Sequence, residues 1–144
     1  MQRYLGRFEA SAYTLLRVVL AFLYWSHGPK WLFGWFGGRP GGMTFEDLPT
    51  RFVVAGVLES VGGILLALGL FTSWVAFLAC GEMAVAYFIA HIPRGGWMPI
   101  INGGEITVAL CFGFLYIATR GGGPLSLDAM FGSGAGARPS GRSR

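Results

Sequence analysis

Four long apolar stretches limit what this chain can fold into. They cover residues 12–33, 52–71, 74–92 and 102–119, and each approaches the roughly 20 residues that an α-helix needs to cross a bilayer. The chain is 53% hydrophobic and only 12% charged, whereas a soluble domain of this size needs a more charged surface. We therefore predict an all-α, polytopic membrane protein, a bundle of four transmembrane helices with a short interfacial segment between helices one and two.

The composition divides the 144 residues into two parts. Residues 1–131 are predicted to form one four-helix transmembrane domain. Residues 132–144 are rich in Gly, Ser, Ala and Arg, a composition that is typical of disordered segments.

The basic residues lie at the ends of the spans and in the tail. They form no patch with interleaved aromatic residues, so the net charge of +4 indicates no nucleic-acid partner. The positive-inside rule places the two termini in the cytoplasm and makes the lipid bilayer the first partner. On the side of the termini lie Arg3, Arg7, Arg17, Arg120, Arg138, Arg142 and Arg144; on the other side lie Lys30, Arg39, Arg51 and Arg94.

The first apolar stretch contains the sequence His27-Gly28-Pro29. Proline lacks an N–H group and disfavours the α conformation of the residue before it. We therefore predict that the first helix breaks here, close to lipid. Broken backbone at this depth requires a polar cavity, and His27 and Lys30 are the first candidates to line it, with the nearby ring of Trp31.

Three carboxylates interrupt the other apolar stretches. Glu59 lies between Gly56 and Gly62, so small residues share its helix face and it is expected to point into the bundle. The same reasoning predicts that Glu82 and Glu105 point inward, on helices three and four. Together with His27, Lys30 and His91, these groups are expected to cluster in the extracytoplasmic half of the bundle.

The polar cluster has two interpretations. Intramembrane ionisable residues are functional candidates by default, but paired carboxylates also act as structural contacts between helices. No metal site is predicted, because none of the glutamates has a histidine three residues later, and haem held by His27 and His91 is the weaker alternative. Cys80 and Cys111 are interpreted as small buried hydrophobic side chains.

The chain resembles the DoxX family of small four-helix bacterial membrane proteins. The motifs that carry the resemblance are Arg17, His27-Gly28-x-Lys30, Glu59-x-x-Gly62-Gly63, Gly81-Glu82-Met83, His91-x-Pro93-x-Gly95, Asn102-Gly103-Gly104-Glu105 and Gly123-Pro124-Leu125-Ser126-Leu127-Asp128. The family is named after a small subunit of a thiosulfate:quinone oxidoreductase. The resemblance therefore implies a multi-pass protein of the bacterial inner membrane that is linked to redox metabolism.

This resemblance leads to three hypotheses. In the first, the chain is a quinone-linked accessory subunit of a membrane redox complex: His27 and Lys30 bind the quinone, Glu59 and Glu82 transfer protons as catalytic groups, and Trp31, His91 and Glu105 complete the site. In the second, the same carboxylates serve a small-solute or proton transporter. In the third, the chain is a non-catalytic subunit that helps partner subunits assemble.

Overall fold

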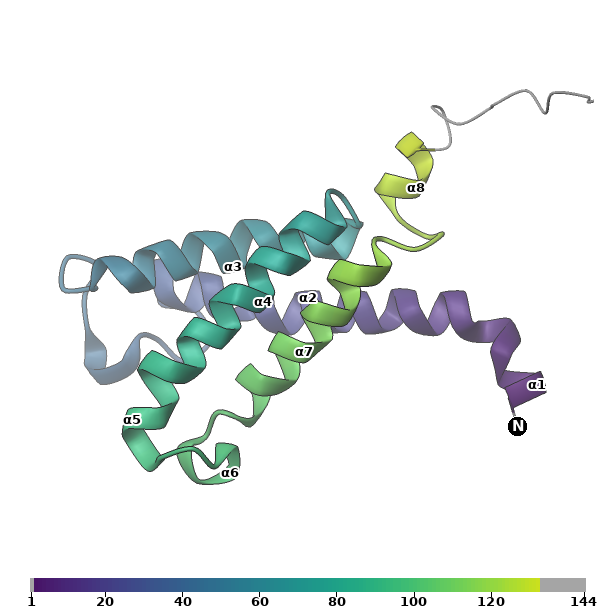
Figure 1. The fold of residues 1–144 in the computed structure, drawn as a ribbon. Helices are drawn as coiled ribbons and strands as arrows, with labels where there is room; N and C mark the ends of the chain where they lie inside the picture. Colours follow the sequence, from purple (N-terminus) through teal and green to yellow (C-terminus); the bar gives the residue numbers. More distant parts are fainter. Residues whose placement is uncertain (1, 133–144) are drawn as a thin grey trace, which may run out of the picture.

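The computed structural model describes residues 2–132, and within them it contains helices and no strands (Figure 1). A short α1 (Gln2–Leu5) and a 3₁₀ turn (Gly6–Phe8) precede the long α2 (Glu9–Phe33). The remaining elements are a 3₁₀ turn (Pro40–Gly42), α3 (Thr50–Leu68), α4 (Thr72–Ala86), a π-helical turn (Tyr87–His91), α5 (Ile92–Gly95), α6 (Pro99–Asn102), α7 (Glu105–Arg120) and α8 (Leu127–Gly132). Apart from Gly132, the tail predicted to be disordered lies outside the described residues.

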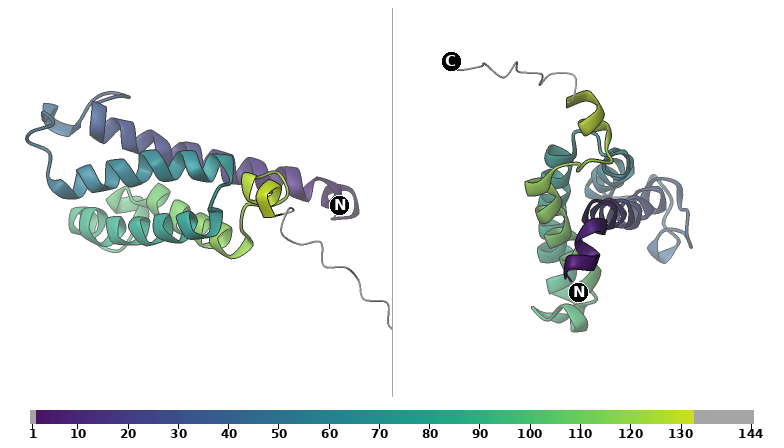
Figure 2. Two further views of the ribbon diagram at one scale, coloured as in Figure 1. Left: turned by 90° about the horizontal axis from the view of Figure 1, so that it is seen from above. Right: turned by 90° about the vertical axis from the view of Figure 1, so that its right-hand side faces the viewer.

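The four long helices form two neighbouring pairs. Helix α2 lies along α3, and α4 lies along α7, with α1, α8 and the α3–α4 turn at the same end of the molecule (Figure 2). All four helices contribute to one core, in which the rings of Tyr24 on α2 and Phe114 on α7 meet edge to face at 5.1 Å. The core therefore joins the two pairs into one bundle.

Three helical stretches are long and apolar enough to cross a membrane: Arg3–Phe33, Thr50–Leu68 and Thr72–Gly95. Their outward faces carry large exposed hydrophobic residues, among them Phe22 and Phe77, as lipid contact requires. Helix α7 has 16 residues and is not among the three. A fourth span therefore stays a prediction.

The predicted break in the first helix is wrong, because α2 continues through Pro29 and ends at Phe33. Proline removes only one hydrogen bond of the ladder, and both Gly28 and Pro29 are buried in the bundle, where protein surrounds the freed backbone. The helix ends where Gly34 takes a left-handed conformation, with φ of 71°, and donates its N–H to the carbonyl of Lys30.

The segment between α2 and α3 contains the 3₁₀ turn at Pro40–Gly42 and no α-helix over residues 43–49. The Asp47 carboxylate accepts hydrogen bonds from the N–H and the hydroxyl of Thr44, which closes a tight turn instead. Arg39 donates to the carbonyls of Trp31 and Leu32 and so satisfies the C-terminal end of α2.

The turn between α3 and α4 is held by two charged side chains from distant parts of the chain. Arg17 is 1% exposed and donates to the carbonyls of Leu66 and Leu125, and to that of Ala67 at 2.9 Å. Asp128 lies on the other side of the turn. It accepts hydrogen bonds from the N–H groups of Phe71 and Thr72 and from the Thr72 hydroxyl, at 2.7–2.9 Å. Arg17 therefore satisfies the end of α3, and Asp128 the start of α4.

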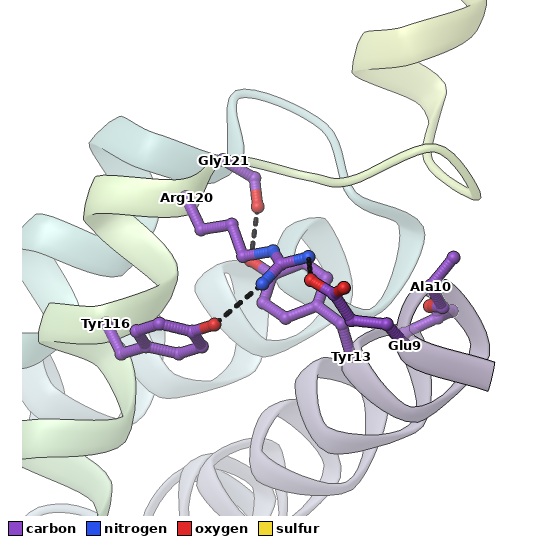
Figure 3. Close-up of polar contacts among 7 residues, drawn as sticks. Glu9, Ala10, Tyr13, Tyr116, Arg120 and Gly121 are labelled. Atoms are coloured by element: carbon purple, nitrogen blue, oxygen red, sulfur yellow. Dashed lines mark hydrogen bonds and ion pairs between the residues drawn. The ribbon is translucent and has the colours of Figure 1, made fainter. Parts of the chain in front are cut away.

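The same end of the molecule joins α2 to α7 (Figure 3). Arg120 donates to the Glu9 carboxylate at 2.6 Å and to the Tyr116 hydroxyl at 2.8 Å. The Tyr13 hydroxyl donates to the carbonyl of Gly121, just after α7. Because these contacts are partly exposed, they contribute little to the stability of the fold. Their main effect is to fix the orientation of α2 against α7.

The backbones of α2 and α3 approach each other closely at glycine positions. A Cβ atom on Gly28 would lie 2.6 Å from the backbone nitrogen of Ser60 and 2.7 Å from the carbonyl oxygen of Gly56. We predict that Gly28→Ala separates the two helices and costs about 1–3 kcal/mol of stability, measured as a lower melting temperature in detergent. Gly81→Ala is the control, because that Cβ would enter open space; an equal loss in both variants would contradict the prediction.

A second prediction concerns Asp128. Burial raises the pKa of its carboxyl, but the hydrogen bonds from Thr72 and Phe71 outweigh burial and hold the pKa below its ordinary value. The charged form is therefore favoured by folding, and its contribution is lost as the pH falls through the lowered pKa. We expect Asp128→Asn to cost about 1 kcal/mol at pH 7.

Thermal melts of wild type and Asp128→Asn from neutral to acidic pH check this. The difference in melting temperature between the two proteins should shrink below a pH of about 4. Glu46→Gln, which removes an exposed carboxylate of the loop between α2 and α3, should melt like wild type at every pH. A difference for Asp128→Asn that stays constant down to acidic pH would contradict the assignment.

Candidate functional site

Two of the predicted glutamates come together in the interior. Glu59 on α3 is 5% exposed, and Glu82 on α4 is half-buried, close enough for their carboxyl groups to interact electrostatically. Between them lies Tyr24 of α2, which is 2% exposed and donates its hydroxyl hydrogen to Oε2 of Glu82. Three helices thus contribute one polar group each.

Each carboxyl of this cluster has one buried oxygen with no hydrogen-bond partner in the described part of the chain, Oε2 of Glu59 and Oε1 of Glu82. The Ser60 hydroxyl, which lies next to Gly28 where α2 meets α3, is unpartnered as well. No basic side chain compensates the carboxyls: within residues 2–132 the one ion pair joins Arg120 to Glu9. Because burial without a partner is costly for oxygen atoms and more so for charged groups, the cluster has capacity to bind a ligand with donors and acceptors.

An apolar groove between α3 and α4 borders this cluster at Tyr24. Its volume is about 210 Å³, and Tyr24 lies on its wall with Gly62 and Ala79. Val61 also lines it and is half exposed on the outer surface. Glu82 lies three residues after Ala79, and Glu59 three before Gly62, so the carboxyls are one helical turn from the groove.

The predicted residues of α2 follow Tyr24 in the sequence but form no hydrogen bond or ion pair with the cluster among the described residues. His27 is half-buried, one helical turn after Tyr24, and Lys30 follows one turn later. No hydrogen bond or ion pair joins either side chain to Glu59 or Glu82 among the described residues. The Trp31 ring stacks on Phe52 at 4.4 Å, where it packs α2 against the start of α3.

The other two predicted residues do not join the cluster. His91 uses both ring nitrogens elsewhere, one 3.2 Å from the carbonyl oxygen of Asn102 and one 3.1 Å from the Thr107 hydroxyl. Glu105 is exposed at the first turn of α7, where a carboxylate favours the positive end of the helix dipole. The prediction that Glu105 points inward is therefore wrong: Ala109 on the same face is exposed as well, and only Gly113, two turns further on, packs against Leu20 of α2.

Sequence reasoning missed two features. The bond from Tyr24 to Glu82 was not expected, although Tyr24 does lie on the buried stripe of α2 with Arg17, Ala21 and Gly28. The sulfur atoms of Cys80 and Cys111 lie 3.7 Å apart, and their separation of 31 positions in the sequence carries no spacing signal. In residues 2–132, no group of three or more His, Cys, Asp or Glu side chains could hold a metal ion.

Comparisons with known proteins agree with this architecture. The DoxX family model matches residues 12–92. An uncharacterized protein of Haemophilus influenzae is 40% identical over 120 residues, which cover 82% of this chain and 89% of that protein. No solved structure matches. The matched range includes Arg17, Glu59 and Glu82, so the family model spans the arginine that holds the α3–α4 turn and both clustered carboxyls. The chain is therefore a membrane protein of the DoxX family.

Proposed function

We propose that this protein binds a quinone between α3 and α4 as an accessory component of a membrane redox complex. The observation that carries the proposal is an apolar groove whose wall includes Tyr24, the residue that bonds Glu82, together with the unpartnered oxygens of Glu59 and Glu82 on the neighbouring helical turns. Ligand sites in helix bundles are mostly apolar with a few converging polar groups. A quinone has the matching shape, a polar ring on an apolar tail.

The residues of the cluster have separate roles in this proposal. A bound quinone supplies the capacity to accept two electrons and two protons. Glu82, fixed by the Tyr24 hydroxyl, holds the ring in its protonated form, in which the O–H on its free oxygen donates to a quinone carbonyl. Glu59 holds a proton that it can give up and regain. Val61 and the other apolar wall residues bind the tail. His27 and Lys30 lie on the neighbouring turns of α2 and orient the opposite edge of the ring.

The cellular setting completes the proposal. The protein lies in the bacterial inner membrane with α7 as its fourth span. The end that carries α1 and α8 faces the cytoplasm, as the distribution of basic residues favours. The quinone site then lies between the two membrane surfaces, where other subunits of a redox complex can exchange electrons with it.

Photolabelling tests the proposed site. Wild-type protein in liposomes is irradiated with an azido-ubiquinone analogue, and the labelled peptides are mapped by mass spectrometry. We expect label on the groove segments 57–65 and 75–79. Val61→Trp should reduce this label at least tenfold, because the indole fills the groove.

Val54→Trp is the matched control. Val54 is 53% exposed and Val61 is 54% exposed, both on α3, but Val54 does not line the groove. The label should therefore persist in Val54→Trp. Label that is spread over all apolar helices, or equal in the two tryptophan variants, would reject the site.

The absence of a basic partner for Glu59 yields a further prediction. An isolated buried carboxylate is costly, so we expect the side chain to be neutral and Glu59→Gln to change stability by less than about 1 kcal/mol. That variant should lose the protein's redox function while it stays folded. Glu59→Lys should impair folding, because it buries a charge without a partner.

Melting temperatures in detergent and yields of folded protein measure these effects. A hidden ion pair with Lys30 would give the opposite result for Glu59→Gln, since removal of one partner of a buried pair costs about 3–5 kcal/mol. A loss of that size would contradict the neutral carboxyl.

A further inference from the structure

The two cysteines of the chain face each other across the α4–α7 interface. Cys80 lies on α4 and Cys111 on α7, and both are half-buried as free thiols. Their sulfur atoms are 3.7 Å apart, which is sulfur–sulfur hydrogen-bond distance. A disulfide needs about 2.05 Å, so side-chain rotation with a small approach of the two helices would join them.

A second groove lies near this pair on the surface of the bundle. It lies between α4 and α7, has a volume of about 420 Å³, and is lined in part by Phe77 and Leu115. Phe77 lies three residues before Cys80, and Leu115 lies four residues after Cys111, so the groove reaches to one helical turn from both thiols. A small lipid-soluble molecule in the groove would lie close to the sulfur atoms.

We propose that Cys80 and Cys111 form a redox-active dithiol that closes to a disulfide between α4 and α7 and passes its electrons to a quinone dissolved in the membrane. Two S–H bonds break and one S–S bond forms. The two electrons and two protons released convert the quinone to a quinol, so the step balances. The choice of acceptor rests on the proposed function; the closure of the disulfide does not.

The experiment measures the two thiols in the full chain in liposomes. Samples are oxidised with copper–phenanthroline in air, or with a ubiquinone analogue whose ring is fully substituted, and are then alkylated and weighed by mass spectrometry. Before oxidation, wild type should take two alkyl groups. After either oxidant it should take none and weigh less by two hydrogen atoms, and a reductant should restore both thiols.

A variant with the same number of thiols is the control. Cys80→Ser with Gly81→Cys moves one thiol around α4 to a position where a Cβ meets open space, away from Cys111. This variant should keep both alkyl groups after oxidation. The proposed dithiol would be overturned if wild type kept both thiols under copper–phenanthroline. It would also be overturned if the control variant formed a disulfide as readily as wild type.

The quinone arm tests the acceptor separately. Closure with copper–phenanthroline but none with the ubiquinone analogue would overturn the assignment of a quinone as acceptor. Val61→Trp fills the groove between α3 and α4 but leaves the groove between α4 and α7 unchanged. This variant should therefore form the Cys80–Cys111 disulfide with the quinone as readily as wild type does. If Val61→Trp no longer forms the disulfide with the quinone, the proposal that the quinone reaches the thiols through the α4–α7 groove is overturned. The function proposed above is decided separately, by the photolabelling result alone.

Discussion

The guanidinium group of Arg17 is the interaction on which the rest of the bundle depends. A charged group that is 1% exposed among apolar helices needs hydrogen-bond partners. The two terminal nitrogens of Arg17 donate to three carbonyls, while its Nε has no partner among the described residues. Two of these belong to the last turn of α3 and one to the segment after α7. A single side chain of α2 thereby fixes where α3 ends and where the chain returns after α7. Asp128 binds the other side of the α3–α4 turn, where its carboxylate caps the start of α4.

The contacts of Arg17 and Asp128 at the α3–α4 turn determine how the polar cluster of Glu59, Glu82 and Tyr24 is built. With the α3–α4 turn fixed, the facing positions of α3 and α4 are fixed as well, and Glu59 and Glu82 are brought beside Tyr24. The cluster contains acidic groups and hydroxyls, and no basic side chain pairs with its carboxyls in residues 2–132. A purely structural network would satisfy its own oxygen atoms, whereas this one leaves a buried oxygen of each carboxyl, on Glu59 and on Glu82, unpartnered. That difference is why we favour a ligand site over a structural contact.

The sequence was sufficient to predict the helices and the buried carboxyl of Glu59, because hydropathy and the spacing of small residues are local signals. It failed at His27-Gly28-Pro29, since the packing of Gly28 on α3 keeps the helix intact through Pro29. It also failed for Glu105, whose position at a helix start outweighs the small residues that follow it. The contacts of Tyr24 with Glu82, and of Cys80 with Cys111, join residues that are distant in sequence, and no periodicity reports such pairings.

The groove between α3 and α4 opens on the outer apolar surface, at Val57 and Val61. Whatever binds there is drawn sideways from the hydrocarbon phase and does not cross an aqueous mouth. Occupancy then depends on how strongly a compound partitions into the bilayer, so that a highly lipophilic compound with modest intrinsic affinity saturates the groove at a low total dose. Lipid acyl chains are the resident competitors, and membrane composition becomes a determinant of apparent affinity.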